Sequence, residues 1–376
     1  MIPNQRHLFS LPDDVVYLNC AYLSPQLKAV SEAGVGGLAG RDRPWLVEPS
    51  DFFAPGDAVR ERFATLIGGD AAGVALIPAA SYGLSVAAAN VEIRPGQTIV
   101  VLAEQFPSNV YPWWQAASSR GARIRTVARE GGSWTDAILE AIDRTTAVVA
   151  IPQCHWTDGS IIDLEAIGRA ARGCGAALVV DASQSVGAHV FDVQAIQPDY
   201  LVTVGYKWLL GPYRTACLWA APHRRDGVPI EHGWMGKEGA EDFSNLVAYT
   251  EAFRTGAMRY DGGEFGDFMA MPMLVAALDQ VQAWGVAEIS ETLGALTGKI
   301  EAGASSLGLV PAPGDERVPH MIGIRFPSGL PAALPGTLRE RKVYVSVRGD
   351  SVRVAPHLYT TDGDVDRLLE VLGSFV

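Results

Sequence analysis

Short apolar runs alternate with amphipathic segments between about residue 70 and residue 220. Each run is apolar at consecutive positions, which is typical of strands that are buried on both faces of a sheet. The runs predict five strands, at residues 98–103, 147–152, 177–182, 199–204 and 215–221. Strands of this kind, separated by helix-length segments, predict an α/β domain with a mostly parallel sheet between helices.

The segments between these runs carry helix-start signals. Asp163 precedes LEAIGRAARGCG, whose apolar residues fall on one helical face, and glycines suit its end. Ser133 and Ser108 precede two further segments of helical character. We therefore expect helices that begin directly after these three polar residues, because their side chains can accept hydrogen bonds from the first free N–H groups.

The pattern changes after about residue 222. Residues 223–268 are rich in glycine and polar residues and have no strong period, and a long irregular segment is usually functional or interfacial. Two long helical patterns follow, and then short strands and helices. We expect a large α/β domain over residues 15–268 and a small C-terminal α+β domain over residues 269–376, together with residues 1–14.

Composition narrows the class of protein. The 376 residues contain 30 Lys and Arg against 42 Asp and Glu, a net charge of −12, which argues against a nucleic-acid partner. The four cysteines are scattered without a C-x-x-C pair, and no histidine pair has metal-ligand spacing. The first residues, MIPNQRHLFSLPDD, lack the apolar core of a signal peptide, and no apolar run reaches the roughly 18 residues of a membrane span. We expect a cytoplasmic protein with no metal and no membrane partner.

Two reactive side chains follow predicted strands. Asp181 ends the strand in VVDASQS, and Lys207 follows the strand in VGYKWLLGPYR. In an open parallel sheet the carboxyl ends of the strands face one crevice, where a carboxylate and an amine are candidates for chemistry. On this spacing alone, a structural ion pair or two solvated loop ends is the simpler interpretation.

Two neighbouring segments favour a ligand. ASYGLS, with Ala80 and Ser81, opens a helix after LIP, and a helix N-terminus attracts phosphate. Phe106 follows another predicted strand, where an aromatic ring can stack on a flat cofactor. Taken singly, the first is an ordinary helix cap and the second an ordinary core residue.

Together these segments, above all VVDASQSVGAHVFDV and DYLVTVGYKWLLGPY, resemble the class V aminotransferase superfamily along nearly the whole chain. The resemblance implies the fold type I, aspartate aminotransferase-like architecture, with a seven-stranded sheet and pyridoxal 5'-phosphate (PLP) as cofactor. It implies that Lys207 forms the aldimine with the cofactor and that Asp181 keeps the pyridine nitrogen protonated. A carboxylate suits that task, because it stabilises a neighbouring cation.

The resemblance assigns further cofactor contacts. It places Gln184 at the phenolic oxygen, Phe106 on the pyridine ring, Asn109 near the ring, and Tyr206, Ser81 and Ala80 at the phosphate.

Within the superfamily, FPSNVY, GWMG and VRVAPHLY are similar to kynureninases. This similarity implies that Trp234 reaches the phosphate of the neighbouring subunit, in a homodimer with sites at the interface. It also implies that Arg353 binds the α-carboxylate of a small amino-acid substrate, for which its planar fork is well suited. The alternative for Arg353 is an exposed charge at the end of a strand.

Two departures from these relatives bear on the reaction. RYDGGEFGD lacks the Asn–Pro pattern with which kynureninases recognise an aryl ketone, and VYVSVRGDSVR lacks the cysteine of desulfurases. The leading hypothesis is an aminotransferase, and the alternative is a kynureninase-like hydrolase or a Cβ or Cγ (C–S) lyase. A non-catalytic scaffold is a third interpretation, but a scaffold needs none of Lys207, Asp181 and Arg353. His155 remains open, as a cofactor contact or as a loop residue. The substrate and the choice between transfer and elimination stay open too.

Overall fold

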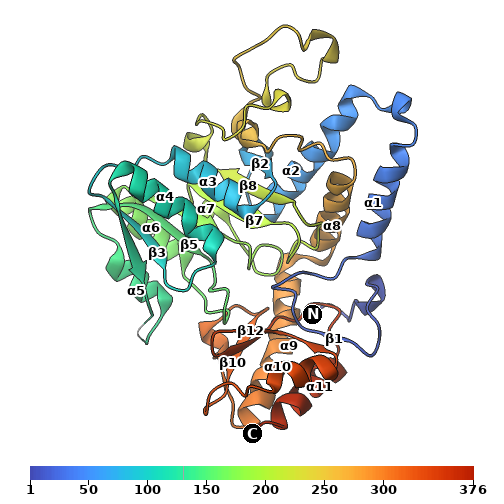
Figure 1. The fold of residues 1–376 in the computed structure, drawn as a ribbon, viewed down its shortest axis with the longest axis vertical. Helices are drawn as coiled ribbons and strands as arrows, with labels where there is room; N and C mark the ends of the chain where they lie inside the picture. Colours follow the sequence, from blue (N-terminus) through green and yellow to red (C-terminus); the bar gives the residue numbers. More distant parts are fainter. Residues whose placement is uncertain (130) are drawn as a thin grey trace.

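A computed structural model describes residues 1–129 and 131–376 of the chain. Its centre is a seven-stranded sheet in which every strand runs parallel to the others except β8 (Figure 1). The strand order is β2 (Val74–Ile77), β8 (Ala216–Ala220), β7 (Tyr200–Val204), β6 (Ala177–Asp181), β5 (Thr146–Pro152), β3 (Thr98–Leu102), β4 (Arg123–Val127). The predicted α/β class with a mostly parallel sheet is confirmed.

The five predicted strands all occur in this sheet, within two residues of their expected ends. Two strands were not predicted: β2, a buried run of only four residues, and β4, whose sequence RIRTV is half polar. Strand β4 lies at one edge of the sheet, where Arg123 is exposed and only Val127 is buried. An edge strand faces solvent along one side, so it lacks the apolar run on which the other predictions rested.

Helices cover both faces of the sheet. Helices α3 (Ala80–Asn90) and α4 (Tyr111–Arg120) pack on one face, and α2 (Ala54–Leu66), α5 (Trp134–Ala141), α6 (Leu164–Cys174) and the short α7 (Val193–Ile196) pack on the other. Alternate residues of each strand point to opposite faces of the sheet. In β3, Ile99 and Val101 pack in the core under α3 and α4, and Val100 and Leu102 pack in the core on the other face.

Two of the three predicted helix starts are confirmed. The side chains of Ser133 and Asp163 accept hydrogen bonds from N–H groups in the first turns of α5 and α6. The third was wrong, since Ser108 lies in a separate 3-10 turn and α4 begins after Val110. The Pro107–Asn109 turn interrupts the chain before the helix starts.

A second, four-stranded antiparallel sheet lies near the C-terminus, in the order β12 (Ser346–Arg348), β13 (Ser351–Val354), β10 (Ile322–Arg325), β9 (Val310–Pro311). Helices α9 (Val286–Ser306), α10 (Leu334–Glu340) and α11 (Asp362–Gly373) complete this part. Strand β1 (Val16–Tyr17) pairs with β11 (Val343–Tyr344). The N-terminal segment therefore belongs to the small C-terminal part at least as far as Tyr17.

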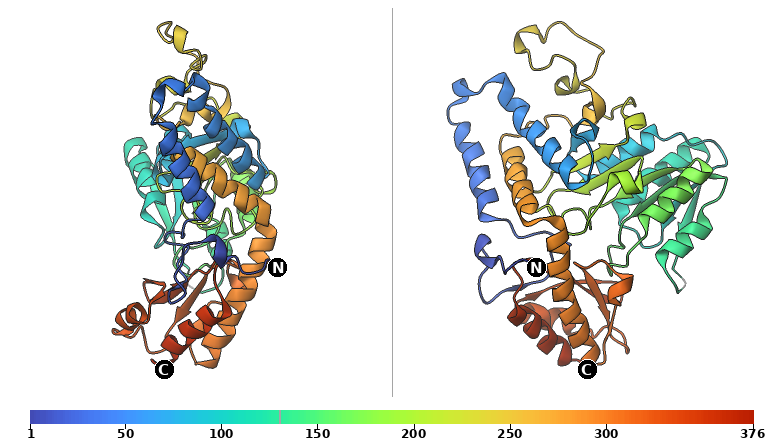
Figure 2. Two further views of the ribbon diagram at one scale, coloured as in Figure 1. Left: turned by 90° about the vertical axis from the view of Figure 1, so that its right-hand side faces the viewer. Right: turned by 180° about the vertical axis from the view of Figure 1, so that it is seen from behind.

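The long helices connect the two parts (Figure 2). Helix α8 (Ala270–Trp284) packs against α1 (Lys28–Gly40) and α2, while α9 packs against α11. Gly285 separates the two helices with a positive φ of 79°. We propose that the domain boundary falls at this glycine, rather than at residues 268/269, and that the N-terminal boundary falls after Tyr17.

The irregular segment 223–268 crosses the large domain as a series of 3-10 turns. Residues 237–253 project beyond the body of the molecule at the top of Figure 1. The segment is held at its base by Arg60 and Asp261, which are both buried and joined by two hydrogen bonds of 2.8–2.9 Å. In the described part of the chain, no helix has the length and apolar character needed to cross a bilayer.

Candidate active site

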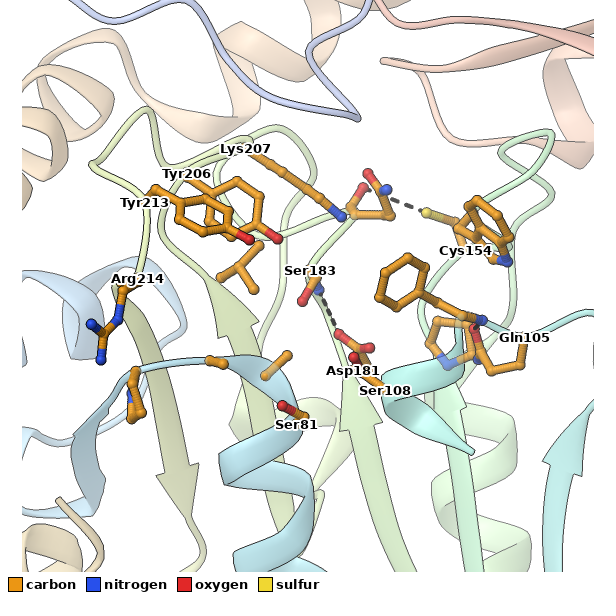
Figure 3. A pocket seen from close by; sticks show the side chains of 18 residues that line it. Ser81, Gln105, Ser108, Cys154, Asp181, Ser183, Tyr206, Lys207, Tyr213 and Arg214 are labelled. Carbon is orange, nitrogen blue, oxygen red and sulfur yellow. Dashed lines mark hydrogen bonds between the residues drawn. The ribbon is translucent and has the colours of Figure 1, made fainter. Parts of the chain in front are cut away.

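A cavity of about 470 Å³ opens at the carboxyl ends of β5, β6 and β7 (Figure 3). Lys207 reaches into it from the loop after β7, and Asp181 from the end of β6. Ser81 lies on the opposite wall, at the start of α3. The sheet thus brings together residues that are far apart in sequence, as expected for the ligand crevice of an open α/β sheet.

Lys207 is almost completely buried, with 8% of its surface exposed. Burial disfavours the charged amine and lowers the pKa of Lys207 to about 8, and the positive charge of Arg353 contributes, while Asp181 opposes the shift. The Nζ atom lies 5.5 Å from the ring centroid of Phe106 and 6.0 Å from that of Tyr206. A lysine in this state has a substantial neutral fraction near pH 8 and can act as a nucleophile or a base.

Asp181 is a buried carboxylate without an ion pair to any described residue. Its Oδ1 accepts a hydrogen bond of 3.1 Å from the backbone N–H of Ser183. Burial raises the pKa of Asp181, although Ser183 and Lys207 both act to lower it. A cationic group in the cavity would offset the cost of burying the Asp181 carboxylate in its charged form, and a protonated pyridine nitrogen is such a group.

The start of α3 offers a place for phosphate. Its N-cap residue, Ala79, provides no side-chain hydrogen bond, and Ala80 and Ser81 line the cavity. Arg214 lines the same cavity and adds a cation there. The sequence did not single out Arg214, because it sits in a turn, with φ of 65°, that comes near α3 only in the folded chain.

Other predicted cofactor residues divide into two groups. Phe106, Gln184 and Tyr206 line the cavity, whereas Asn109 and Trp234 do not. Asn109 is fully buried and its Oδ1 accepts a 3.1 Å hydrogen bond from the indole of Trp113. The 3-10 turn directs this side chain into the α4 core, and Ser108 faces the cavity instead.

Trp234 lies outside the cavity of its own chain. Its indole donates a 3.2 Å hydrogen bond to Glu264 and packs against the rings of Phe52, Phe53 and Phe243. A contact of Trp234 with the cofactor of a neighbouring subunit therefore remains a proposal.

Arg353 is buried in β13, with 1% of its surface exposed. Its Nη1 donates a 2.7 Å hydrogen bond to the carbonyl oxygen of Trp156, and its buried Nε has no partner among the described residues. Burial lowers the pKa of Arg353 to about 9, and the neighbouring charge of Arg348 adds to the effect. The alternative of an exposed strand-end charge is wrong, and an unpaired buried guanidinium is suited to an anionic ligand.

Trp156 connects this arginine to the cavity. Its ring lines the cavity, lies edge-on to Phe106 at 5.5 Å between centroids, and donates a 2.7 Å hydrogen bond to the carbonyl of Glu104. The adjacent His155 turns elsewhere: it stacks on Trp134 at 5.0 Å and its ring nitrogens bond to Thr157 and the Ala103 carbonyl. His155 is therefore a structural loop residue in this fold.

Unsatisfied polar atoms also mark the cavity. The hydroxyl of Ser183 and the amide nitrogen of Gln105 are buried, line the cavity and have no partner among the described residues. Buried polar atoms are normally hydrogen-bonded, so these two point to a polar ligand. The amine, the carboxylate, the aromatic ring and the helix start together fit PLP. No cluster of three or more potential metal ligands occurs within the two described stretches.

One cysteine lines the cavity. Cys154 is buried there, and its thiol contacts the carbonyl of Gln184 at 3.5 Å. Burial raises the pKa of the Cys154 thiol, so it is protonated at neutral pH and a poor nucleophile. The turn between β12 and β13 consists of Gly349 and Asp350, which leaves no room for a mobile cysteine loop before Arg353.

The chain belongs to the class V aminotransferase family, whose model matches residues 51–368. It is a PLP-dependent enzyme, as are the members of this family.

Three curated relatives illustrate the range of this family. A probable cysteine desulfurase from Methanothermobacter thermautotrophicus is 26% identical, over 83% of this chain and 82% of its own length. An uncharacterized aminotransferase, YcbU from Bacillus subtilis, is 26% identical over 84% of this chain and 82% of its own. A kynureninase from Deinococcus radiodurans is 28% identical over 74% and 68%. The predicted closeness to kynureninases is thus supported only in part.

Solved structures confirm the fold. A cysteine desulfurase from Thermococcus onnurineus NA1 superimposes with a TM-score of 0.83 at 19% identity, over 100% of this chain and 99% of the other. C-DES, in a variant with glycine covalently linked to its PLP cofactor, gives a TM-score of 0.85 at 17% identity, over 98% and 99%. Both have the fold of this chain along nearly its whole length.

Proposed function

We propose that the protein transfers the amino group of a small α-amino acid, with Lys207 as the residue that carries the cofactor. The observation that carries this proposal is that Lys207 and Asp181 meet in one cavity, while Arg353 lies against Trp156, an aromatic residue that lines the same cavity. Bound PLP supplies an electron sink for the pair left on Cα when a bond to it breaks.

The residues of the chain take distinct roles in this proposal. Arg353 binds the α-carboxylate and so orients the bonds around Cα, because its fork pairs with both carboxylate oxygens. Lys207, with its lowered pKa, accepts the Cα proton at Nζ and returns it at a later step. Asp181 holds a proton on the pyridine nitrogen, and Phe106 limits movement of the ring and excludes water from that side.

Phosphate is held at the start of α3 in the same proposal. The N–H groups of Ala80 and Ser81, the hydroxyl of Tyr206 and the cation of Arg214 are the groups of this chain that line that end of the cavity. A helix N-terminus and an arginine together favour a dianion.

The second candidate function is a lyase that eliminates a group at Cβ or Cγ, as in C–S bond cleavage. Its support is the number of desulfurases among the relatives and the presence of a cystine C–S lyase among the structural neighbours. Persulfide transfer through a loop cysteine is not part of this candidate, since the β12–β13 turn has no cysteine.

A spectral screen separates the two candidates. The purified holoenzyme is mixed with single amino acids, with and without an α-keto acid. Conversion of the cofactor to its amine form, reversed by the keto acid, supports transfer. Release of ammonia together with a keto acid, without that conversion, replaces transfer with elimination.

Substitution of Lys207 tests whether this residue carries the cofactor. We expect Lys207→Ala to abolish the visible absorption of the lysine–cofactor linkage and the turnover of every amino acid, while phosphate contacts retain some cofactor. Lys299→Ala, at an exposed lysine of α9 outside the cavity, is the control. A Lys207→Ala protein that still binds the cofactor in a borohydride-reducible form would exclude Lys207 as the attachment point.

A further inference from the structure

A second arginine accompanies Arg353 beside Trp156, the aromatic residue through which Arg353 approaches the cavity. Arg348 ends β12, and the β12–β13 register pairs Ser346 with Arg353. Side chains two residues apart on a strand share a face, so Arg348 and Arg353 lie on the same face of the small sheet. Their guanidinium carbons lie 5.5 Å and 5.9 Å from the ring centroid of Trp156, the aromatic wall of the cavity.

Neither of these arginines has a counter-ion among the residues that the structure describes. No carboxylate of the described residues forms an ion pair with Arg348 or Arg353, although most buried arginines of this protein, such as Arg60 and Arg317, have one. The Nε atoms of both are buried and unpartnered, and Arg348 otherwise donates to the carbonyl of its own neighbour, Val347, at 2.8 Å.

The two cations also repel each other. The charge of Arg348 contributes to the lowered pKa of Arg353, and burial lowers the pKa of Arg348 itself. Two partly desolvated like charges beside the same aromatic ring are costly unless a ligand neutralises them. A single α-carboxylate neutralises one of the two guanidinium groups and leaves the other without a counter-ion.

We infer that the substrate is an α-amino acid with a second carboxylate on its side chain, which Arg348 binds. This inference rests on the proposed function, in which Arg353 holds the α-carboxylate. The assignment of the two arginines follows from burial: Arg353 is the deeper and its charge acts on Lys207, whereas Arg348 is only half-buried. The distal carboxylate therefore points along Trp156 toward the outer edge of the cavity.

Isosteric pairs of amino acids test the inference. The holoenzyme is titrated with aspartate and asparagine, and with glutamate and glutamine, and kcat/KM of the first half-reaction is measured for each. A charge-assisted contact between Arg348 and the side-chain carboxylate should make kcat/KM about 10- to 100-fold higher for aspartate than for asparagine, or for glutamate than for glutamine. In Arg348→Gln this acid-to-amide ratio falls to near 1, and Arg348→Lys restores part of it, because a point charge lacks the fork.

A matched control is available on the same sheet. Arg325 lies on β10 and forms an ion pair of 3.3 Å with Asp350. Arg325→Gln therefore removes a guanidinium from the same sheet, but one that already has a carboxylate partner in the protein. We expect the acid-to-amide ratio to be unchanged in this variant. If Arg325→Gln lowers the ratio as much as Arg348→Gln does, a general loss of positive charge explains the effect and the inference is wrong.

A binding measurement separates this inference from the proposed function. Calorimetry compares glutarate and succinate with butyrate on the holoenzyme and on Arg348→Gln. Tighter dicarboxylate binding that requires Arg348, without turnover of any amino acid, supports Arg348 as the site of a second carboxylate but overturns the proposed function and, with it, the assignment of an amino-acid substrate. Turnover of neutral amino acids with no preference for acids, and no selective dicarboxylate binding, overturns the inference and leaves the proposed function in place.

Discussion

Lys207 experiences two opposing influences, because burial lowers its pKa and the carboxylate of Asp181 raises it. Only the neutral amine attacks the aldehyde of PLP, so the apoprotein should react faster as pH rises through about 8 and level off about one unit higher. Stopped-flow absorbance after mixing apoprotein with PLP measures this profile. A midpoint near the ordinary lysine value of 10.5 would contradict the burial argument.

Asp181→Asn should move that midpoint to lower pH. The carboxylate favours the charged amine, so its removal leaves desolvation less opposed. Asp226→Asn, at a carboxylate that is 96% exposed, is the control and should leave the midpoint where it is. An upward shift in Asp181→Asn would show that Asp181 does not act on Lys207 electrostatically.

Arg353 offers a separate test of substrate binding. Loss of a charge-assisted bidentate pair costs on the order of 1.5–3 kcal/mol, or about 10- to 100-fold in kcat/KM, so Arg353→Ala should lose that factor. Arg353→Lys should recover only part of it. The measurement compares an amino acid with its decarboxylated amine. An equal loss on both substrates would mean that Arg353 does not bind the α-carboxylate.

At the scale of elements, the loop after β6 makes a close backbone contact with the loop after β7. Gly187 follows Asp181 and has φ of 103°, and a Cβ there would lie 2.4 Å from the carbonyl oxygen of Trp208. Trp208 is the residue next to Lys207, and its indole donates a 3.0 Å hydrogen bond to Gln184. The position of the lysine thus depends on a backbone contact that only glycine permits.

Gly187→Ala should therefore destabilise the fold by at least about 2 kcal/mol and reduce the fraction of Lys207 that carries cofactor. Denaturant unfolding and visible absorbance measure the two effects. Gly175→Ala is the matched control, because Gly175 also has a positive φ, of 79°, but a Cβ there meets nothing within 4 Å. Equal effects of the two substitutions would leave backbone strain, and not the contact with Trp208, as the cause.

At the scale of the whole molecule, we propose a homodimer with its sites at the subunit interface. The projecting residues 237–253 carry Val247 and Tyr249, which are 82% and 95% exposed, and Trp45 is 74% exposed on the α1–α2 connection. Large apolar side chains at such exposure are typical of interaction surfaces. The nearby Trp234 then comes close to the phosphate of the second subunit.

Light scattering should give twice the chain mass of 40.1 kDa. Tyr249→Asp should shift the protein toward the monomer and weaken PLP binding, because a charge is buried at the interface. Val310→Asp, at an exposed apolar residue on β9, should change neither quantity. A monomer with full cofactor occupancy and activity would contradict the proposal.

The sequence by itself determined the class of the fold and the chemistry of the cavity. Apolar runs predicted five of the seven strands, since a strand covered on both faces can carry few polar residues. Because Asp181 and Lys207 directly follow such strands, the topology of a parallel sheet was enough to bring them together.

Only the tertiary structure decided which other side chains reach the cavity. Trp156 and Arg214 reach it because of turn geometry, and Arg348 approaches Trp156 because the small domain packs against the large one. The same packing turned Asn109 toward Trp113 and His155 toward Trp134, although both follow strands. Local patterns report whether a position is buried, but contacts between distant segments determine the direction in which a loop side chain points.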